Sequence, residues 1–150
     1  MWLAKAEAGC STWHSTEEQD CFEGWQDGYR RLPDPVLHRR RIVLDKPRRR
    51  ILIEDRLEMN GEHAVELFFH FAGDCHPRAA DDAWLLEREQ LRVRMKLPTV
   101  EGCVARVGRG ELDPPLGWLS PAFDVLVPAS TLVWRAVLRG TTVLRTVIEC

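Results

Sequence analysis

The sequence has no hydrophobic run longer than a few residues, whereas a helix that crosses a bilayer needs about 20. Its first residues also lack the basic-then-apolar layout of a signal peptide. We therefore expect no association with a membrane. The 150 residues are 45% hydrophobic and 29% charged, which is enough chain and enough apolar surface for one folded domain with its own core.

Paired cysteines and the common catalytic motifs are also missing. There is an odd number of cysteines and no CxxC pair, so the sequence predicts neither a disulfide framework nor a zinc ribbon; they are Cys10, Cys21, Cys75, Cys103 and Cys150. The sequence has no glycine-rich phosphate loop, no GxSxG elbow and no HExxH. These absences predict no bound cofactor or metal and exclude the enzyme classes that those motifs define.

Alternating hydrophobic and polar residues predict strands through most of the chain. The clearest alternation covers 90–97, where Leu91, Val93 and Met95 alternate with amide or charged side chains. Similar patterns occur at 51–57, 63–71, 131–138 and 142–148. In the first of these, Asp55 falls on the apolar side, so it needs a buried partner or a bulge.

Turn residues separate the predicted strands. Asn60-Gly61 is the strongest signal, because both central positions of a primed hairpin turn need positive φ. Arg139-Gly140 predicts a terminal hairpin between the last two strands. Other turns are expected at Lys46-Pro47 and Glu101-Gly102. Short strands with frequent turns predict an all-β fold, an antiparallel β-sandwich that forms a single domain over residues 1–150.

Two segments depart from this pattern. Residues 82–96 could form an amphipathic helix capped by Asp82, but the strict alternation after Gln90 favours two strands. Residues 1–22 show no regular period, and we expect an irregular N-terminal segment there.

Charge is balanced over the chain but uneven along it. The total of 21 Lys and Arg against 23 Asp and Glu excludes a generically basic nucleic-acid binder. The segment from Arg30 to Arg50, however, contains nine basic residues and only two acidic ones, and eight of the nine are Arg. Arg pairs bidentately with carboxylate or sulfate. The segment therefore predicts an anion-binding surface; its candidate substrate-binding residues are Arg30, Arg31, Arg39, Arg40 and Arg41.

The alternative is that these arginines simply keep exposed strand and turn positions soluble. Tyr29 is the only aromatic residue interleaved with these arginines, so the segment offers few rings on which nucleic-acid bases could stack. We therefore do not expect nucleic acid as a partner. His38 and Tyr29 are candidate catalytic residues for proton transfer at a carbon beside a carboxylate. The alternative for Tyr29 is a core or rim position, and for His38 a buried position hydrogen-bonded between strands.

A second group combines residue types that bind zinc: His63, His70, Cys75 and His76. His63 and His70, both in the predicted strand at 63–71, are seven residues apart, so they face opposite sides of that strand. This spacing argues against a shared metal ion.

Several short blocks together resemble the C-terminal β-rich part of the heparinase II/III-like polysaccharide lyases. The blocks are DGYRRL at 27–32, PVLHRR at 35–40, LIEDRL at 52–57, GEHAV with FHF at 61–71, and GWLSP at 117–121. The resemblance extends over roughly residues 23–149. It implies an antiparallel β-sandwich that follows an α/α toroid in a longer chain, with a periplasmic or cell-envelope location.

The resemblance also implies an activity, β-elimination at a uronic acid of an acidic polysaccharide such as an exopolysaccharide or glycosaminoglycan. The toroid and a His-Asn segment supply most catalytic groups in such lyases, and this sequence has no His-Asn pair. We therefore expect the isolated domain to be inactive and to depend on an upstream toroid. Some members hold zinc through His and Asp, but Gln26 stands where their His-Asp-Gly-Tyr block begins with His. A stand-alone acidic-carbohydrate-binding or scaffolding module is the alternative function.

Overall fold

The structure is a computed structural model that describes residues 5–150, and these residues form strands and connections without a helix. They group into two compact units. The first contains the chain up to His63 together with Leu138–Glu149, and the second contains Ala64–Val137 and Cys150. No helix in the described part of the chain is long and apolar enough to cross a membrane.

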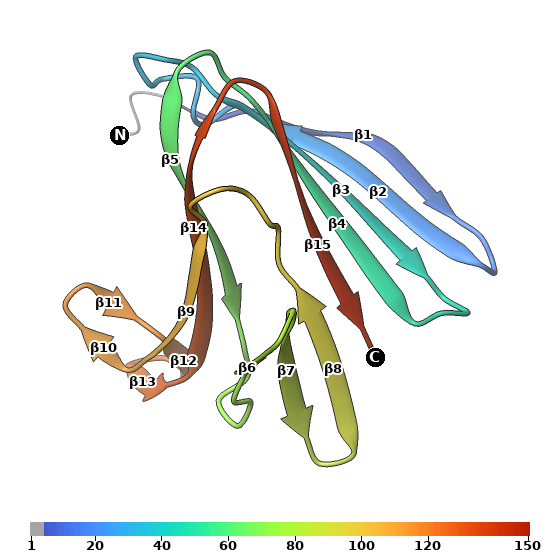
Figure 1. The fold of residues 1–150 in the computed structure, drawn as a ribbon, viewed down its shortest axis with the longest axis vertical. Helices are drawn as coiled ribbons and strands as arrows, with labels where there is room; N and C mark the ends of the chain where they lie inside the picture. Colours follow the sequence, from blue (N-terminus) through green and yellow to red (C-terminus); the bar gives the residue numbers. More distant parts are fainter. Residues whose placement is uncertain (1–4) are drawn as a thin grey trace. The chain divides into compact units, whose positions relative to one another are not determined.

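The first unit is an antiparallel sheet of five strands in the order β1-β2-β3-β4-β15 (Figure 1). Its strands are β1 (Ala8–Ser15), β2 (Gln19–Gln26), β3 (Leu37–Asp45), β4 (Arg50–Glu58) and β15 (Thr142–Glu149). The buried residues Asp55 and Leu57 of β4 and Leu144 and Thr146 of β15 lie on one face, because successive side chains of a strand point to opposite sides, whereas Cys21 of β2 is buried on the other face.

The second unit contains a three-stranded sheet in the order β5-β14-β9 and several antiparallel ladders. The sheet strands are β5 (Glu62–His70), β14 (Ser130–Arg139) and β9 (Val104–Arg109). Strands β6 (Arg78–Ala80), β7 (Ala83–Arg88) and β8 (Leu91–Lys96) pair in succession. Two short hairpins follow, β10 (Glu111–Leu112) with β11 (Pro115–Leu116), and β12 (Trp118–Ala122) with β13 (Val125–Pro128).

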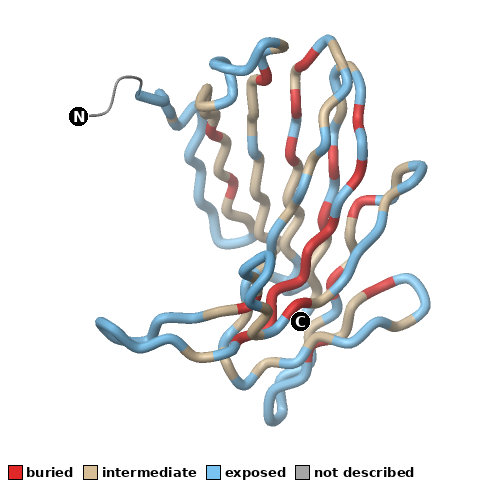
Figure 2. The backbone as a smooth tube through the Cα atoms, turned by 90° about the vertical axis from the view of Figure 1, so that its left-hand side faces the viewer, coloured by how far each residue is buried: buried red, intermediate tan, exposed pale blue. Residues whose placement is uncertain are grey.

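Strand β14 is the core of the second unit. Its first five residues are all buried, and the long red stretch in Figure 2 marks this strand. Leu132 and Trp134 are 0% and 1% exposed, and Trp134 Nε1 donates a hydrogen bond of 2.9 Å to the carbonyl oxygen of Pro98. The indole N–H is thereby satisfied inside the core, as a buried donor requires.

Hydrophobic alternation predicted the strands well, and the all-β antiparallel fold class is confirmed. Residues 82–96 form β7 and β8, so two strands and not a helix occupy this segment. In β5, half-buried residues alternate strictly with exposed ones, as the pattern at 63–71 predicts. The Lys46-Pro47 turn is also confirmed, because it joins the paired strands β3 and β4.

Two predicted hairpins are wrong. Strand β4 pairs with β3 and β15 whereas β5 neighbours β14, so the segment at Asn60-Gly61 connects strands of different sheets. Neither residue has a positive φ. The carboxylate of Asp34 instead accepts the Gly61 N–H at 2.7 Å and holds this connection from a distant loop. Gly140 has φ of +69°, but β14 and β15, which it separates, likewise do not pair with each other.

The prediction of an irregular segment at 1–22 is also corrected. Residues 1–4 lie outside the described part, but β1 and the first half of β2 fall within this segment. The pairing shifts by a β-bulge between Cys10 and Thr12, which breaks the two-residue period that reveals a strand in a sequence. Pairing of β2 with β3 along its whole length holds the segment extended.

Candidate functional site

Strand β3 divides the predicted arginine cluster between two faces of the first unit's sheet. His38 and Arg40 point to the face that contains Asp55, Leu57 and Leu144, and Arg39 and Arg41 point to the opposite face. Arg40 pairs directly with Asp55 of β4 in the ladder, and His38 with Leu57. Strand alternation therefore prevents these residues from forming one continuous anion-binding surface.

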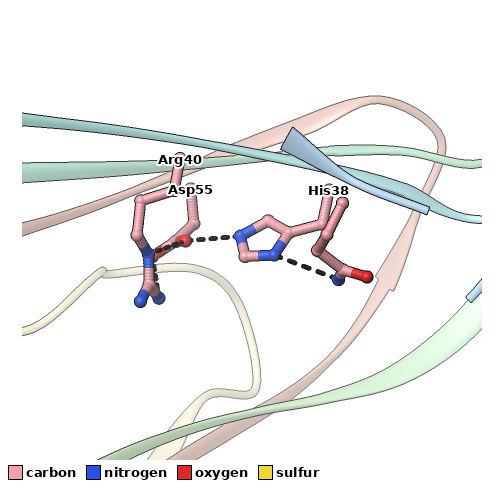
Figure 3. A network of polar contacts seen from close by, with 4 residues as sticks. His38, Arg40 and Asp55 are labelled. Atoms are coloured by element: carbon pink, nitrogen blue, oxygen red, sulfur yellow. Dashed lines mark hydrogen bonds and ion pairs between the residues drawn. The ribbon is translucent and has the colours of Figure 1, made fainter. Parts of the chain in front are cut away.

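Asp55 is the centre of a polar network (Figure 3). The residue is 2% exposed, and its Oδ1 lies 2.6 Å from His38 Nε2. Arg40 donates to both carboxylate oxygens, from Nε to Oδ1 at 2.7 Å and from Nη2 to Oδ2 at 3.0 Å. Burial alone would raise the pKa of Asp55, but the hydrogen bonds from His38 and Arg40 outweigh it and hold the pKa below its usual value. The buried carboxylate is thus charged and paired.

Gln26 extends the network to β2. Its Nε2 lies 3.4 Å from His38 Nδ1, and its Oε1 accepts the Gly28 N–H at 2.8 Å. The amide orientation fixes Nδ1 as the acceptor, so His38 donates from Nε2 to Asp55. His38 is therefore hydrogen-bonded between strands, as the alternative to a catalytic role expects, but it is half-buried rather than buried.

The network does not fit a zinc ion. Asp55 already accepts hydrogen bonds at both oxygens, including two from a guanidinium, and a dication would have to displace Arg40. Among residues 5–150 no three His, Cys, Asp or Glu side chains are close enough together to share a metal. His63 pairs instead with Asp34 at 2.7 Å, and His70 Nδ1 lies 3.0 Å from Thr131 Oγ1.

The opposite face of this sheet carries exposed ion pairs between neighbouring strands. Glu54 accepts from Arg41 at 3.2 Å and from Arg145 at 2.8 Å. Glu58 accepts from Arg56 at 2.9 Å and from Arg39 at 3.4 Å. Acidic side chains of β4 thereby neutralise the positive charge that is concentrated in the sequence of β3.

The remaining predicted site residues lie in the connection between β2 and β3. Tyr29, Arg30 and Arg31 are exposed there, and Arg30 lies 4.0 Å from Asp27. Within residues 5–150 no hydrogen bond joins the Tyr29 hydroxyl to His38.

A hollow of about 420 Å³ lies beside the network, on the face of Arg40. Its lining residues are Ala8, Gly9, Cys10, Phe22, Gly24, Trp25, Gln26, His38 and Arg40. Small residues of β1 and β2 leave this space open. At Gly24 an added Cβ would lie 2.7 Å from the ring of Phe22, so only glycine allows that ring to lean over the strand. Ligand sites combine such an apolar wall with a few polar groups.

The family profile "Heparinase II/III-like, C-terminal" matches residues 1–147. The fold is therefore that of the β-rich C-terminal part of a class of polysaccharide lyases. This chain belongs to the heparinase II/III-like family, as the C-terminal region that the profile describes. No curated protein matches the chain.

Solved structures agree on the fold. The heparan sulfate lyase HepC from Pedobacter heparinus is similar with a TM-score of 0.78 at 11% identity, over 95% of this chain and 21% of that one. A heparinase III gene product gives a TM-score of 0.72 at 14% identity, again over 95% and 21%. The chain thus spans about a fifth of the length of these proteins. The predicted β-sandwich fold class is confirmed.

Proposed function

We propose that this chain is the C-terminal β-rich part of a lyase that cleaves acidic, uronate-containing polysaccharide by β-elimination. The observation that carries the proposal is the family match over residues 1–147. The structural neighbours support it, since one is named a heparan sulfate lyase and each is about five times as long as this chain. An upstream domain, expected to be the α/α toroid, completes the enzyme.

The chemistry of β-elimination explains why this part needs the rest of the enzyme. A base takes the proton beside the carboxylate, a C=C double bond forms, the bond to the leaving oxygen breaks, and an acid protonates that oxygen. His38 is hydrogen-bonded to Gln26 and Asp55, and Tyr29 is 48% exposed in the connection between β2 and β3. These contacts favour a supporting role for the β part and catalytic groups on the upstream domain.

The test is a lyase assay on two forms of the protein. The native polypeptide, captured from its source cells with an antibody to this domain, and the 150-residue chain alone are each incubated with heparan sulfate, hyaluronan and alginate. Ultraviolet absorbance then reports the unsaturated uronate. We expect product from the native polypeptide on at least one polymer and none from the chain alone. Absence of product from a native polypeptide several times larger than 17.3 kDa would contradict the proposal.

A further inference from the structure

Three rows of paired residues cross strands β1, β2 and β3 on the face that carries Arg40. The rows are Trp13, Phe22 and Ile42; Cys10, Gly24 and Arg40; and Ala8, Gln26 and His38. The bulge between Cys10 and Thr12 places Trp13 on the same face as Cys10, although the two are three residues apart. Without the bulge, Trp13 would point to the other side of the sheet.

These rows form a surface with an aromatic end, a hollow centre that Arg40 lines, and a polar end with Gln26 and His38. From this arrangement we propose that the rows bind an acidic oligosaccharide segment, with one sugar ring against Trp13 and the carboxylate or sulfate of another at Arg40. The choice of substrate class rests on the proposed function, but the binding site itself belongs to this chain alone.

The aromatic end supplies an apolar platform. Trp13 is 71% exposed, which is unusual for the largest side chain, and Phe22 packs edge-on against it with ring centroids 6.3 Å apart. The contact with Phe22 holds the indole in place while most of it stays open to solvent. Aromatic faces bind the C–H groups of sugar rings because those groups are apolar and slightly positive.

Arg40 in the central row supplies hydrogen-bond donors to this surface rather than negative charge. The side chain of Arg40 is 44% exposed whereas that of Asp55 is 3% exposed, so a ligand meets the guanidinium and not the carboxylate. Arg40 donates from Nε and Nη2 to Asp55, and within residues 5–150 its Nη1 makes no hydrogen bond. A pre-oriented guanidinium with free donors suits a sugar carboxylate or sulfate.

The spacing suits an oligosaccharide better than a single small anion. Trp13 and Arg40 lie in the first and second rows, about 6.8 Å apart along the strands, and on β1 and β3, about 9.6 Å apart across the sheet, so their backbone positions are about 12 Å apart. The hollow of about 420 Å³ lies between the two ends. On the opposite face of the sheet the paired carboxylates of Glu54 and Glu58 are 20% and 34% exposed, so a ligand there also meets negative charge.

The binding test uses the 150-residue chain and a heparan sulfate hexasaccharide, titrated by calorimetry at low salt. We expect binding that weakens about tenfold in Trp13→Ala, which corresponds to about 1.4 kcal/mol, and by a similar factor in Arg40→Lys. Matched controls are Phe123→Ala, a fully exposed aromatic residue of the second unit, and Arg56→Met on the opposite face. Both should bind as the unchanged chain does, and far-ultraviolet circular dichroism checks that each variant is folded.

Three results would overturn the inference: no binding by the unchanged chain, equal losses in the two control variants, or equal affinity for a neutral cellohexaose. The lyase assay separates this failure from failure of the proposed function. An active native polypeptide whose C-terminal chain binds no oligosaccharide would overturn only the binding site. Binding by the chain without elimination by the native polypeptide would overturn only the lyase proposal.

Discussion

Consecutive arginines of β3 lie on two faces of the sheet and form different kinds of ion pair there. On one face Arg40 binds Asp55, a carboxylate that is 2% exposed. On the other face Arg39 and Arg41 bind Glu58 and Glu54, and both of these arginine side chains are about 40% exposed. The environment of the acidic partner, not the number of arginines, therefore determines what each ion pair contributes.

Solvation explains the difference. A buried carboxylate has lost its water, so removal of one partner leaves a charge that the interior does not stabilise. An exposed pair exchanges its partner for water and contributes little to stability. We therefore expect large effects from the Asp55 network and small ones from the opposite face.

Arg40→Met should destabilise the chain more than any other single change considered for these two faces. This variant leaves Asp55 with His38 as its one charged or ionisable partner, and we expect the free energy of unfolding in urea to fall by about 3 kcal/mol. The matched variant Arg41→Met removes an exposed partner of Glu54 and should lower it by less than about 1 kcal/mol. Equal losses in the two variants would mean that burial of the acidic partner does not distinguish the faces.

Sequence reasoning named Asp55, His38 and Arg40 separately but did not connect them as one network. The position of Asp55 on an apolar face indicates that it needs a buried partner. The identity of that partner follows from the turn, because a hairpin at Lys46-Pro47 that pairs Asp45 with Arg50 also pairs Arg40 with Asp55. Once the turn is placed, the pairing of each residue of β3 with β4 can be counted from the sequence. This register assigns the arginines of the cluster to two faces of the sheet.

Other features could not be read from local sequence. The connection at Asn60-Gly61 is set by Asp34, which lies 27 residues before Gly61, so a strong turn signal there predicted the wrong pairing. The bulge in β1 hides a strand whose position depends on β2. Strand existence follows from side-chain alternation, whereas sheet order depends on contacts between residues that are distant in the chain.

The next effect in size concerns pH. Because the pKa of Asp55 is lower in the folded chain than in the unfolded chain, the unfolded state binds its proton first as the pH falls. The stabilising contribution of Asp55 is therefore complete at neutral pH and is lost below about pH 4, the usual value for Asp. Urea unfolding at pH 7 and pH 3 should show a smaller difference in Asp55→Asn than in the unchanged chain.

Glu54→Gln serves as the control on the opposite face. Hydrogen bonds from Arg145 and Arg41 also lower the pKa of Glu54, so this variant should reduce the pH difference in the same direction. Because those arginines are exposed, the reduction should be smaller than in Asp55→Asn. A larger reduction in Glu54→Gln would mean that the exposed face, not the buried network, governs acid stability.

Salt should distinguish the two faces through a variant whose own effect is small. Arg145→Met removes one donor to Glu54 from a side chain that is 68% exposed, and it should change the free energy of unfolding by at most about 0.5 kcal/mol at low ionic strength. Raising the salt to about 1 M shortens the screening length to about 3 Å, so this difference should disappear. The loss in Arg40→Met should persist at the same salt, because Asp55 is shielded from the ions. The two faces would then differ in salt dependence, even if the losses of unfolding free energy at low ionic strength were closer than we expect. A loss in Arg145→Met that persists in high salt would contradict the assignment of that pair as exposed.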